Sequence, residues 1–74
     1  MSEEISEIDK AILSAILEDS HRPSAITSIV NGRGVNCTQN EVVKALNELE
    51  DKGLVERYTS KTWLAKPSAA DYID

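Results

Sequence analysis

The stretch that decides the fold is TQNEVVKALNELEDKGLVER, residues 38–57. It opens on a capping box, in which the Thr38 side chain can accept from the Glu41 amide while the Glu41 side chain reaches back to the Thr38 amide. Apolar residues then recur at helical spacing along one face, namely Val42, Ala45, Leu46 and Leu49. Gly53 can take the left-handed conformation that ends a helix, so the stretch predicts a helix over residues 38–52.

The chain after this helix changes to a strand-like pattern. Residues 54–58 and 62–65 are rich in β-branched and aromatic side chains, and the polar residues 59–61 between them predict a turn. The turn lacks the Asn-Gly or Asp-Gly pair that most strongly marks a hairpin. We nevertheless predict a β-hairpin over residues 54–65.

Two further helices are predicted upstream. The first covers residues 7–18, where apolar positions occupy roughly half of the circumference, which is wider than the ~100° stripe of a typical surface helix. The second covers residues 23–31, with Pro23 in its first turn and Gly32 as the left-handed residue that ends it.

The length of 74 residues allows one domain, residues 1–74, with a thin core. We expect residues 1–5 to be a frayed lead-in and residues 67–74 to be an acidic tail or the start of a last helix capped by Ser68. No apolar run approaches the ~20 residues that span a bilayer, so we expect no membrane partner. The acidic opening at 1–4 lacks the basic segment of a secretory signal, and we expect a cytoplasmic protein.

The net charge of −5 is unevenly distributed. Residues 1–32 hold two cations against six carboxylates, and residues 67–74 hold two carboxylates and no cation. Residues 33–66 hold six cations against five carboxylates. The acid is therefore concentrated at the two ends, and the predicted third helix and hairpin lie in a slightly basic middle.

Neither catalysis nor a cofactor is predicted. The single cysteine, Cys37, cannot form an internal disulfide, and with one histidine, His21, it cannot make a metal site. We expect Cys37 to be a reduced, partly buried small apolar residue. A paired-carboxylate pocket, a Ser-His-Asp set and a glycine-rich phosphate loop are all missing from the sequence. We therefore predict that the chain is not an enzyme and holds no metal.

Residues 38–57, which end in Leu-Glu-Asp-Lys-Gly-Leu-Val-Glu-Arg, resemble the recognition helix and first wing strand of MarR-like winged helix regulators. The segment from Trp63 to Ile73 is similar to the second wing strand and following helix of small phage-type and archaeal repressors. The resemblance implies an α+β winged helix-turn-helix fold of three helices plus a C-terminal two-stranded β-hairpin wing. It also implies a transcription regulator that binds double-stranded DNA.

In such a fold, helix 38–52 would lie in the major groove and the wing 54–65 on the backbone. Side-chain amides can bond adenine and valine can touch a thymine methyl, so the base-reading candidates are Gln39, Asn40 and Val43. The backbone-contact candidates are Thr38, Lys44, Asn47, Arg57 and Lys61. Carboxylates near the helix end would repel phosphate, and we place them away from the groove: Glu48, Glu50 and Asp51.

A homodimer is expected, because so small a domain contacts few base pairs. Leu13 and Leu17 lie at the far edge of the wide apolar face of the first helix and are candidates for the interface. The apolar residues near the C-terminus are a second candidate surface.

Two alternative functions compete with DNA regulation. The acidic ends and the carboxylates of the third helix favour a winged helix module that binds other proteins. A Z-DNA or Z-RNA binding winged helix would also carry a hairpin tryptophan. That family's pattern has Asn and Tyr on the third helix, where this chain has Val43 and Asn47, and a Pro-Pro pair before the tryptophan, where Thr62 precedes Trp63.

Overall fold

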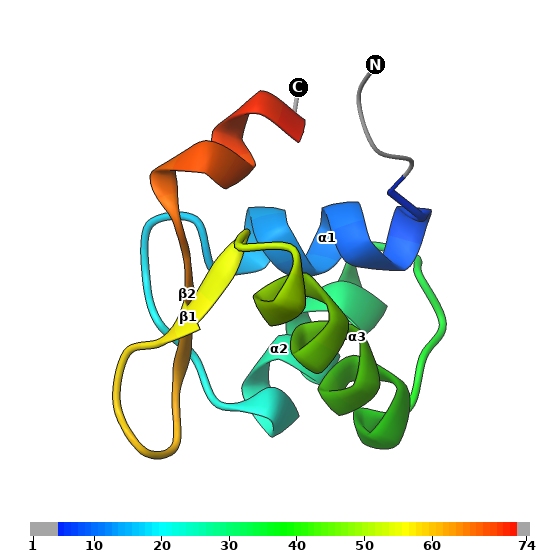
Figure 1. Cartoon of the computed structure of the whole chain (residues 1–74). Helices are drawn as coiled ribbons and strands as arrows, with labels where there is room; N and C mark the ends of the chain where they lie inside the picture. Colours follow the sequence, from blue (N-terminus) through cyan, green and yellow to red (C-terminus); the bar gives the residue numbers. More distant parts are fainter. Residues whose placement is uncertain (1–4, 73–74) are drawn as a thin grey trace.

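Figure 1 shows helices packed around one another with a β-hairpin beside them, over the part of the chain that the computed structural model describes, residues 5–72. The helices are α1 (Glu7–Ala15), α2 (Pro23–Gly32) and α3 (Gln39–Asp51). The hairpin follows as β1 (Val55–Arg57) and β2 (Trp63–Ala65), and after it comes a short 3₁₀ helix, η1 (Pro67–Tyr72). This order confirms the predicted α+β architecture, with three helices before a two-stranded wing.

One hydrophobic core lies between the helices and the hairpin. The most completely enclosed side chains come from all three helices and from β1: Ile12, Leu13, Ile16, Ile26, Val30, Val42, Leu46, Leu49 and Val55. Trp63, which is 6% exposed, closes the core beneath the wing. Among residues 5–72, no polar or charged side chain is buried, so burial of apolar surface is the main stabilising contribution of this core.

The start of α3 follows the sequence prediction. Thr38 Oγ1 accepts a hydrogen bond from the Glu41 amide at 3.2 Å, and the Thr38 amide donates to Glu41 Oε1 at 2.9 Å. These two bonds form the predicted capping box, which satisfies amides that the first turn of a helix leaves unpaired.

The end of α3 is also the predicted one. Gly53 has a φ of 76°, in the left-handed region. Its amide donates to the Glu50 carbonyl, and the Leu54 amide donates to the Leu49 carbonyl. This pair of bonds is a Schellman motif, in which the glycine conformation lets the chain leave the helix toward β1.

The prediction that Gly32 ends the second helix in a left-handed conformation is wrong. Gly32 is the last helical residue, and Gly34, with a φ of 89°, is the left-handed one. The amides of Gly34 and Val35 donate to the carbonyls of Asn31 and Val30, which is again a Schellman motif. This ending packs Val35 against the core, a tertiary contact that the local Asn-Gly-Arg-Gly pattern could not reveal.

The first helix is shorter than the predicted 7–18. α1 ends at Ala15, and beyond it the Ile16 carbonyl accepts a hydrogen bond from the Ala65 amide of β2 at 2.9 Å. Further along, His21 and Trp63 form an antiparallel bridge with N···O distances of 3.1 and 2.9 Å. The segment between α1 and α2 is therefore attached to β2, where the sequence alone indicates a loop.

The prediction of a homodimer interface through Leu13 is wrong as well. Leu13 is 0% exposed inside the core, and Leu17 is half-buried and packs against the same core. α1 contacts both α2 and α3, and Ile16 bonds to β2, so the domain itself covers the wide apolar face.

The chain after β2 turns into η1 without a cap from Ser68. The Ser68 hydroxyl donates instead to the Gly53 carbonyl at 3.2 Å, and Ala69 is buried, so η1 is attached to the end of α3. Residues 1–4 of the predicted lead-in and residues 73–74 of the predicted C-terminal tail lie outside the described residues. Across residues 5–72, no helix has the length and hydrophobicity required to cross a lipid bilayer.

Candidate nucleic-acid interface

α3 presents a polar row to solvent on the side opposite the core. Gln39, Val43 and Asn47 follow one another at every fourth position, so they lie along one face of the helix. All three are exposed, and Val43, at 36% exposed, is the apolar member of the row. The strip predicted for base contacts therefore points outward rather than into the fold.

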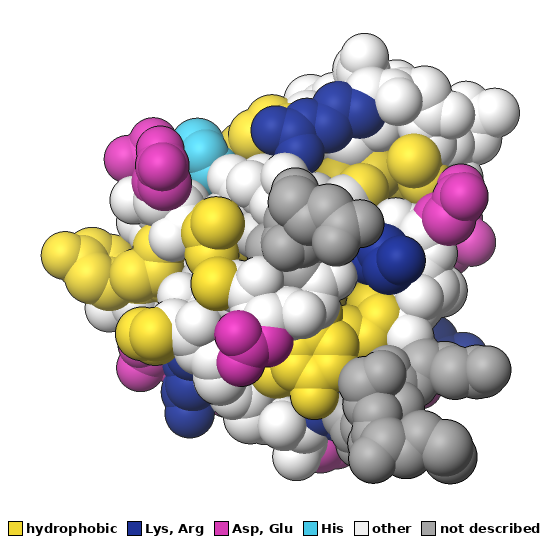
Figure 2. Space-filling model, turned by 90° about the horizontal axis from the view of Figure 1, so that it is seen from above, with side chains coloured by type: hydrophobic (Ala, Val, Ile, Leu, Met, Phe, Trp, Pro, Cys, Tyr) yellow, Lys and Arg dark blue, Asp and Glu magenta, His cyan; other side chains and the backbone are white. Residues whose placement is uncertain are grey.

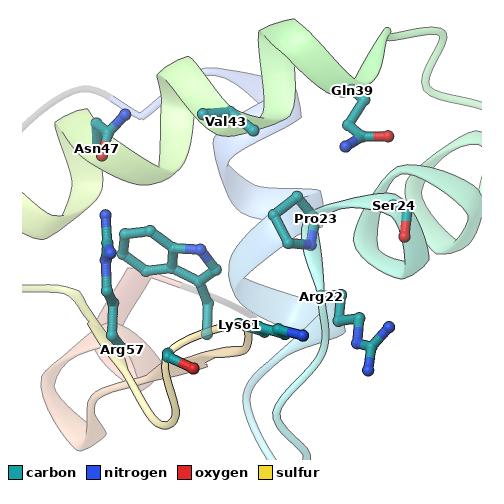
Figure 3. Close-up of a pocket in the computed structure, with 10 residues that line it drawn as sticks. Arg22, Pro23, Ser24, Gln39, Val43, Asn47, Arg57 and Lys61 are labelled. Atoms are coloured by element: carbon teal, nitrogen blue, oxygen red, sulfur yellow. The ribbon is translucent and has the colours of Figure 1, made fainter.

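The wing places an arginine beside this row. β1 and β2 pair antiparallel in a register that sets Arg57 opposite Trp63, and Arg57 Cζ lies over the indole at 5.0 Å from the ring centroid. A guanidinium at this distance is attracted by the π-face of the ring. Figure 3 shows the Arg57 side chain extending from the wing toward α3 and Asn47.

The wing tip is ordered by a hydroxyl in place of an Asn-Gly turn. Thr59 Oγ1 accepts from the amides of Lys61 at 3.2 Å and Thr62 at 3.1 Å, and it lies 2.7 Å from Thr62 Oγ1. Threonine can support a turn through this kind of side-chain to backbone bond. The bonds define the backbone that carries Lys61.

The start of α2 supplies a third element. Through the bridge between His21 and Trp63, the backbone just before α2 is held against β2. The next residue, Arg22, is the N-cap of α2 and makes no side-chain capping bond, and Pro23 occupies the first turn. A helix N-terminus carries partial positive charge, which adds to the charge of the exposed Arg22 side chain.

These three elements border an open hollow of about 410 Å³, here named the cationic hollow. It is lined by Arg22, Pro23 and Ser24 from α2, by Gln39, Val43 and Asn47 from α3, and by Arg57, Ser60, Lys61 and Trp63 from the wing. In Figure 3, the α3 row forms one wall and the wing cations the facing one. The lining has three cations and no carboxylate, so a chain of net charge −5 concentrates positive charge here.

The cationic hollow gathers most of the residues that the sequence indicates for DNA contact: Gln39, Val43, Asn47, Arg57 and Lys61. Asn40 is exposed near the start of α3 but does not line the hollow. Thr38 is also exposed, and its side chain is engaged in the capping box.

Lys44 lies apart from the other predicted contacts. It lines a second hollow, of about 250 Å³, between α3 and the start of α1. The other lining residues of this acidic hollow are Ser6, Ile8, Asp9, Glu41, Ala45 and Glu48. Three carboxylates surround the one cation there, which makes this side of α3 a poor surface for phosphate.

Several lining residues were not indicated by the sequence pattern. Arg22 carried a usable signal, since a cation directly before a proline in the first helical turn lies at a helix N-terminus. Trp63 belongs to the core, and its ring also contacts Arg57 at the hollow. Pro23, Ser24 and Ser60 had no distinguishing pattern.

The orientation of α3 relative to α2 depends on an amide side chain. Asn31 Nδ2 donates to the carbonyls of Thr27 at 2.9 Å and Cys37 at 3.1 Å, while its Oδ1 accepts from the Cys37 amide at 3.3 Å. These bonds connect the end of α2 to the turn that enters α3. They help to hold the α3 row at a constant position relative to Arg22.

Cys37 is a half-buried free cysteine that packs against the core, as the sequence predicts. Burial, together with the negative charge of Glu41, raises the pKa of the Cys37 thiol, which disfavours the reactive thiolate. Among residues 5–72, no group of His, Cys, Asp and Glu side chains is arranged to hold a metal ion.

The helices, the hairpin and the outward row of α3 define a winged helix-turn-helix domain, and the predicted fold is confirmed. The chain matches the TBPIP/Hop2 winged helix domain over residues 9–63, and it belongs to that family.

The solved structures support the same fold. The chain is similar to the crystal structure of IdeR from T. acidophilum, with a TM-score of 0.68 and 16% sequence identity. The similarity covers 92% of this chain and 31% of that one, so the chain spans less than a third of the length of IdeR. No curated protein sequence matches the chain significantly.

Proposed function

We propose that this chain is the sequence-specific, double-stranded DNA-binding domain of a transcription regulator, with α3 in the major groove and the wing on the adjacent backbone. The observation that supports this proposal most strongly is the cationic hollow, where Arg22, Arg57 and Lys61 surround the amide row of α3 without a carboxylate. Cations that neutralise phosphates supply affinity, and amide side chains that reach base edges supply specificity. The function is binding, without a chemical step.

The N-terminal turns of α3 carry the base-reading groups. Gln39 and Asn40 can each bond adenine through two hydrogen bonds, and Val43 can contact a thymine methyl. Because the capping box satisfies the helix start through Thr38 and Glu41, neither amide side chain is needed as a cap. The positive end of the helix dipole then also points toward the duplex.

The C-terminal half of α3 limits how much of the helix enters the groove. Glu50 follows Val43 by about two helical turns on the same side, with Asp51 about a quarter-turn away, whereas Glu48 lines the acidic hollow. Glu50 and Asp51 are exposed and would repel phosphates on the groove wall. In the proposed complex, therefore, only the first turns of α3 lie in the groove.

Titration of a fluorescent mixed-sequence duplex, followed by anisotropy, tests the proposal. If the three cations of the cationic hollow neutralise three phosphates, binding releases counterions, and duplex affinity should fall about 40-fold between ~50 and ~200 mM salt. Lys61→Ala should reduce the salt slope by about one, whereas Lys44→Ala, in the acidic hollow, should leave it unchanged. An absence of binding at ~50 mM salt would exclude this function.

Sequence specificity is tested by selecting bound duplexes from a random pool. We expect an enriched motif in which adenine occupies the positions opposite Gln39 or Asn40, and recovery of a random pool without enrichment would contradict base reading.

We also propose that the regulator acts as a homodimer and that the C-terminal segment supplies the interface. Figure 2 looks onto the side where η1 lies, and hydrophobic side chains reach the surface there in several places. Tyr72 at the end of η1 is half-buried. Sedimentation velocity should give a dimer for the parent chain and a monomer for Tyr72→Glu, and a monomeric parent would refute the proposal.

A protein-binding module is the second candidate, and the acidic hollow favours it. Asp9, Glu41 and Glu48 outnumber Lys44 there, which suits a basic partner better than DNA. The duplex titration distinguishes the two, since a module of this kind would show no duplex binding even at low salt.

A further inference from the structure

The wing contains a cation–aromatic pair whose two members differ in exposure. Trp63 is 6% exposed and belongs to the core, whereas Arg57 is exposed at the edge of the cationic hollow. The β1–β2 register pairs the two residues directly, and the Arg57 Cζ lies 5.0 Å from the centroid of the indole. The pair therefore connects a buried ring to a charge at the proposed DNA surface.

Trp63 is a well-fixed platform for this contact. One edge of its strand pairs with β1. On the other edge, the Trp63 amide donates to the His21 carbonyl at 2.9 Å, and the His21 amide donates to the Trp63 carbonyl at 3.1 Å. Its ring contributes to the core cluster. Because the backbone on both sides and the core packing fix the ring of Trp63, the contact between the two side chains restricts the position of Arg57.

A guanidinium that lies over a ring keeps its hydrogen-bonding capacity. The attraction to the indole uses the flat π-face of the ring, and the N–H donors of arginine point outward in the guanidinium plane. Arg57 can therefore bond a phosphate through two N–H groups while it remains over Trp63. A lysine would keep the charge but lose the guanidinium over the ring and the paired bonds.

The geometry points to a positioning role for Trp63: we propose that it holds Arg57 beside α3 as a preorganised phosphate clamp, so that this wing position requires arginine. The inference rests on the proposed DNA binding and adds one claim, that one wing cation acts through its orientation as well as its charge. A side chain that is already ordered loses less conformational entropy on binding.

The experiment compares two substitutions that preserve charge in the same hollow. Arg57→Lys should weaken duplex binding about five- to tenfold at constant salt, because both the ring contact and the paired phosphate bonds are lost. Lys61→Arg, the matched control at the wing tip, should stay within about twofold of the parent. Thermal unfolding of Arg57→Lys and Lys61→Arg, both at exposed positions, checks that the fold is unchanged.

A double-mutant cycle between Arg57→Lys and Trp63→Leu supplies a readout that a purely structural role of Trp63 would not change. Once the aromatic ring is gone, Arg57 is no longer held in place, and Arg57→Lys should cost about twofold or less, so the two effects should be clearly non-additive. If Trp63→Leu does not fold, the fluorescence of this single tryptophan in Arg57→Lys replaces the cycle, and its emission should shift when the guanidinium leaves the ring.

Each outcome decides one claim. The positioning role is overturned, with DNA binding left intact, by any of four results. These are parent-like affinity of Arg57→Lys, equal losses of affinity in both charge-preserving variants, additive costs in the cycle, and unshifted tryptophan emission. If the parent itself fails to bind duplex at low salt, the proposed function is refuted and the positioning role with it.

Discussion

The two hollows on either side of α3 have opposite electrostatic character. The cationic hollow is built by α3 with the start of α2 and the wing, and its charged residues are all positive. The acidic hollow is built by α3 with the start of α1, and carboxylates dominate it. One helix thus presents a surface that attracts phosphate and, about a quarter-turn or more away, a surface that repels it.

This difference shows why net charge is a poor guide to partners. A total of −5 argues against nucleic acid, yet the charges that matter are those within about a Debye length, ~10 Å, of the bound phosphate. In the proposed complex, the carboxylates of the acidic hollow would face away from the cationic hollow and would help to orient the domain on DNA.

The largest expected effect comes from reversing the charge of the cationic hollow. The double substitution Arg22→Glu and Lys61→Glu removes two phosphate contacts and adds repulsion, so we expect at least about a hundredfold loss of duplex affinity at ~50 mM salt. Lys44→Glu is the matched control in the acidic hollow and should cost about threefold or less. Anisotropy titration measures both, and similar losses in the two hollows would abolish the distinction between them.

A smaller effect should separate residues inside the cationic hollow from those at its margin. Gln39→Ala should cost about 1–3 kcal/mol on the selected duplex and relax the preference at one base pair. Asn40→Ala removes a neighbouring amide that does not line the hollow, and its loss should be smaller. Binding to a set of single-base variants measures both, and a larger loss for Asn40 would show that the hollow does not mark the base-reading residues.

The walls of the two hollows should differ in local stability. The cationic hollow depends on a wing tip whose Lys61 and Thr62 amides both donate to Thr59 Oγ1, whereas helices form the acidic hollow. Thr59→Val removes that acceptor and should lower the free energy of unfolding by about 1 kcal/mol. It should also speed amide exchange at the tip.

Ser60→Ala provides the control for this comparison, because Ser60 lies in the same loop. Denaturant unfolding and hydrogen exchange measure the two variants. Unchanged exchange at the tip of Thr59→Val would mean that the hydroxyl does not order the wing.

The smallest expected effect concerns the acidic hollow itself. Neutralising it with Asp9→Asn and Glu48→Gln should raise duplex affinity about two- to threefold at low salt, because these charges repel DNA only at a distance. The gain should vanish at ~500 mM salt, where screening is strong. A loss of affinity would instead place these carboxylates in the interface.

Local sequence determined the elements that rest on short-range chemistry. The capping box at Thr38 and Glu41, the glycine end at Gly53, and the apolar face of α3 all depend on residues within a turn or two of each other. The outward position of Gln39, Val43 and Asn47 follows from the same helical periodicity. For these features, tertiary packing agreed with the local preference.

The tertiary structure decided the features that depend on partners distant in the chain. α1 ends early where Ile16 bonds Ala65, Leu13 is buried in the core, and the left-handed glycine after α2 is the one that lets Val35 pack against the core.

The same holds for the cationic hollow, since the pairing of His21 with Trp63 brings Arg22 to the hollow that the wing also lines. No pattern of neighbouring residues encodes such a contact, because backbone pairing and burial between remote segments are set by how the whole core packs.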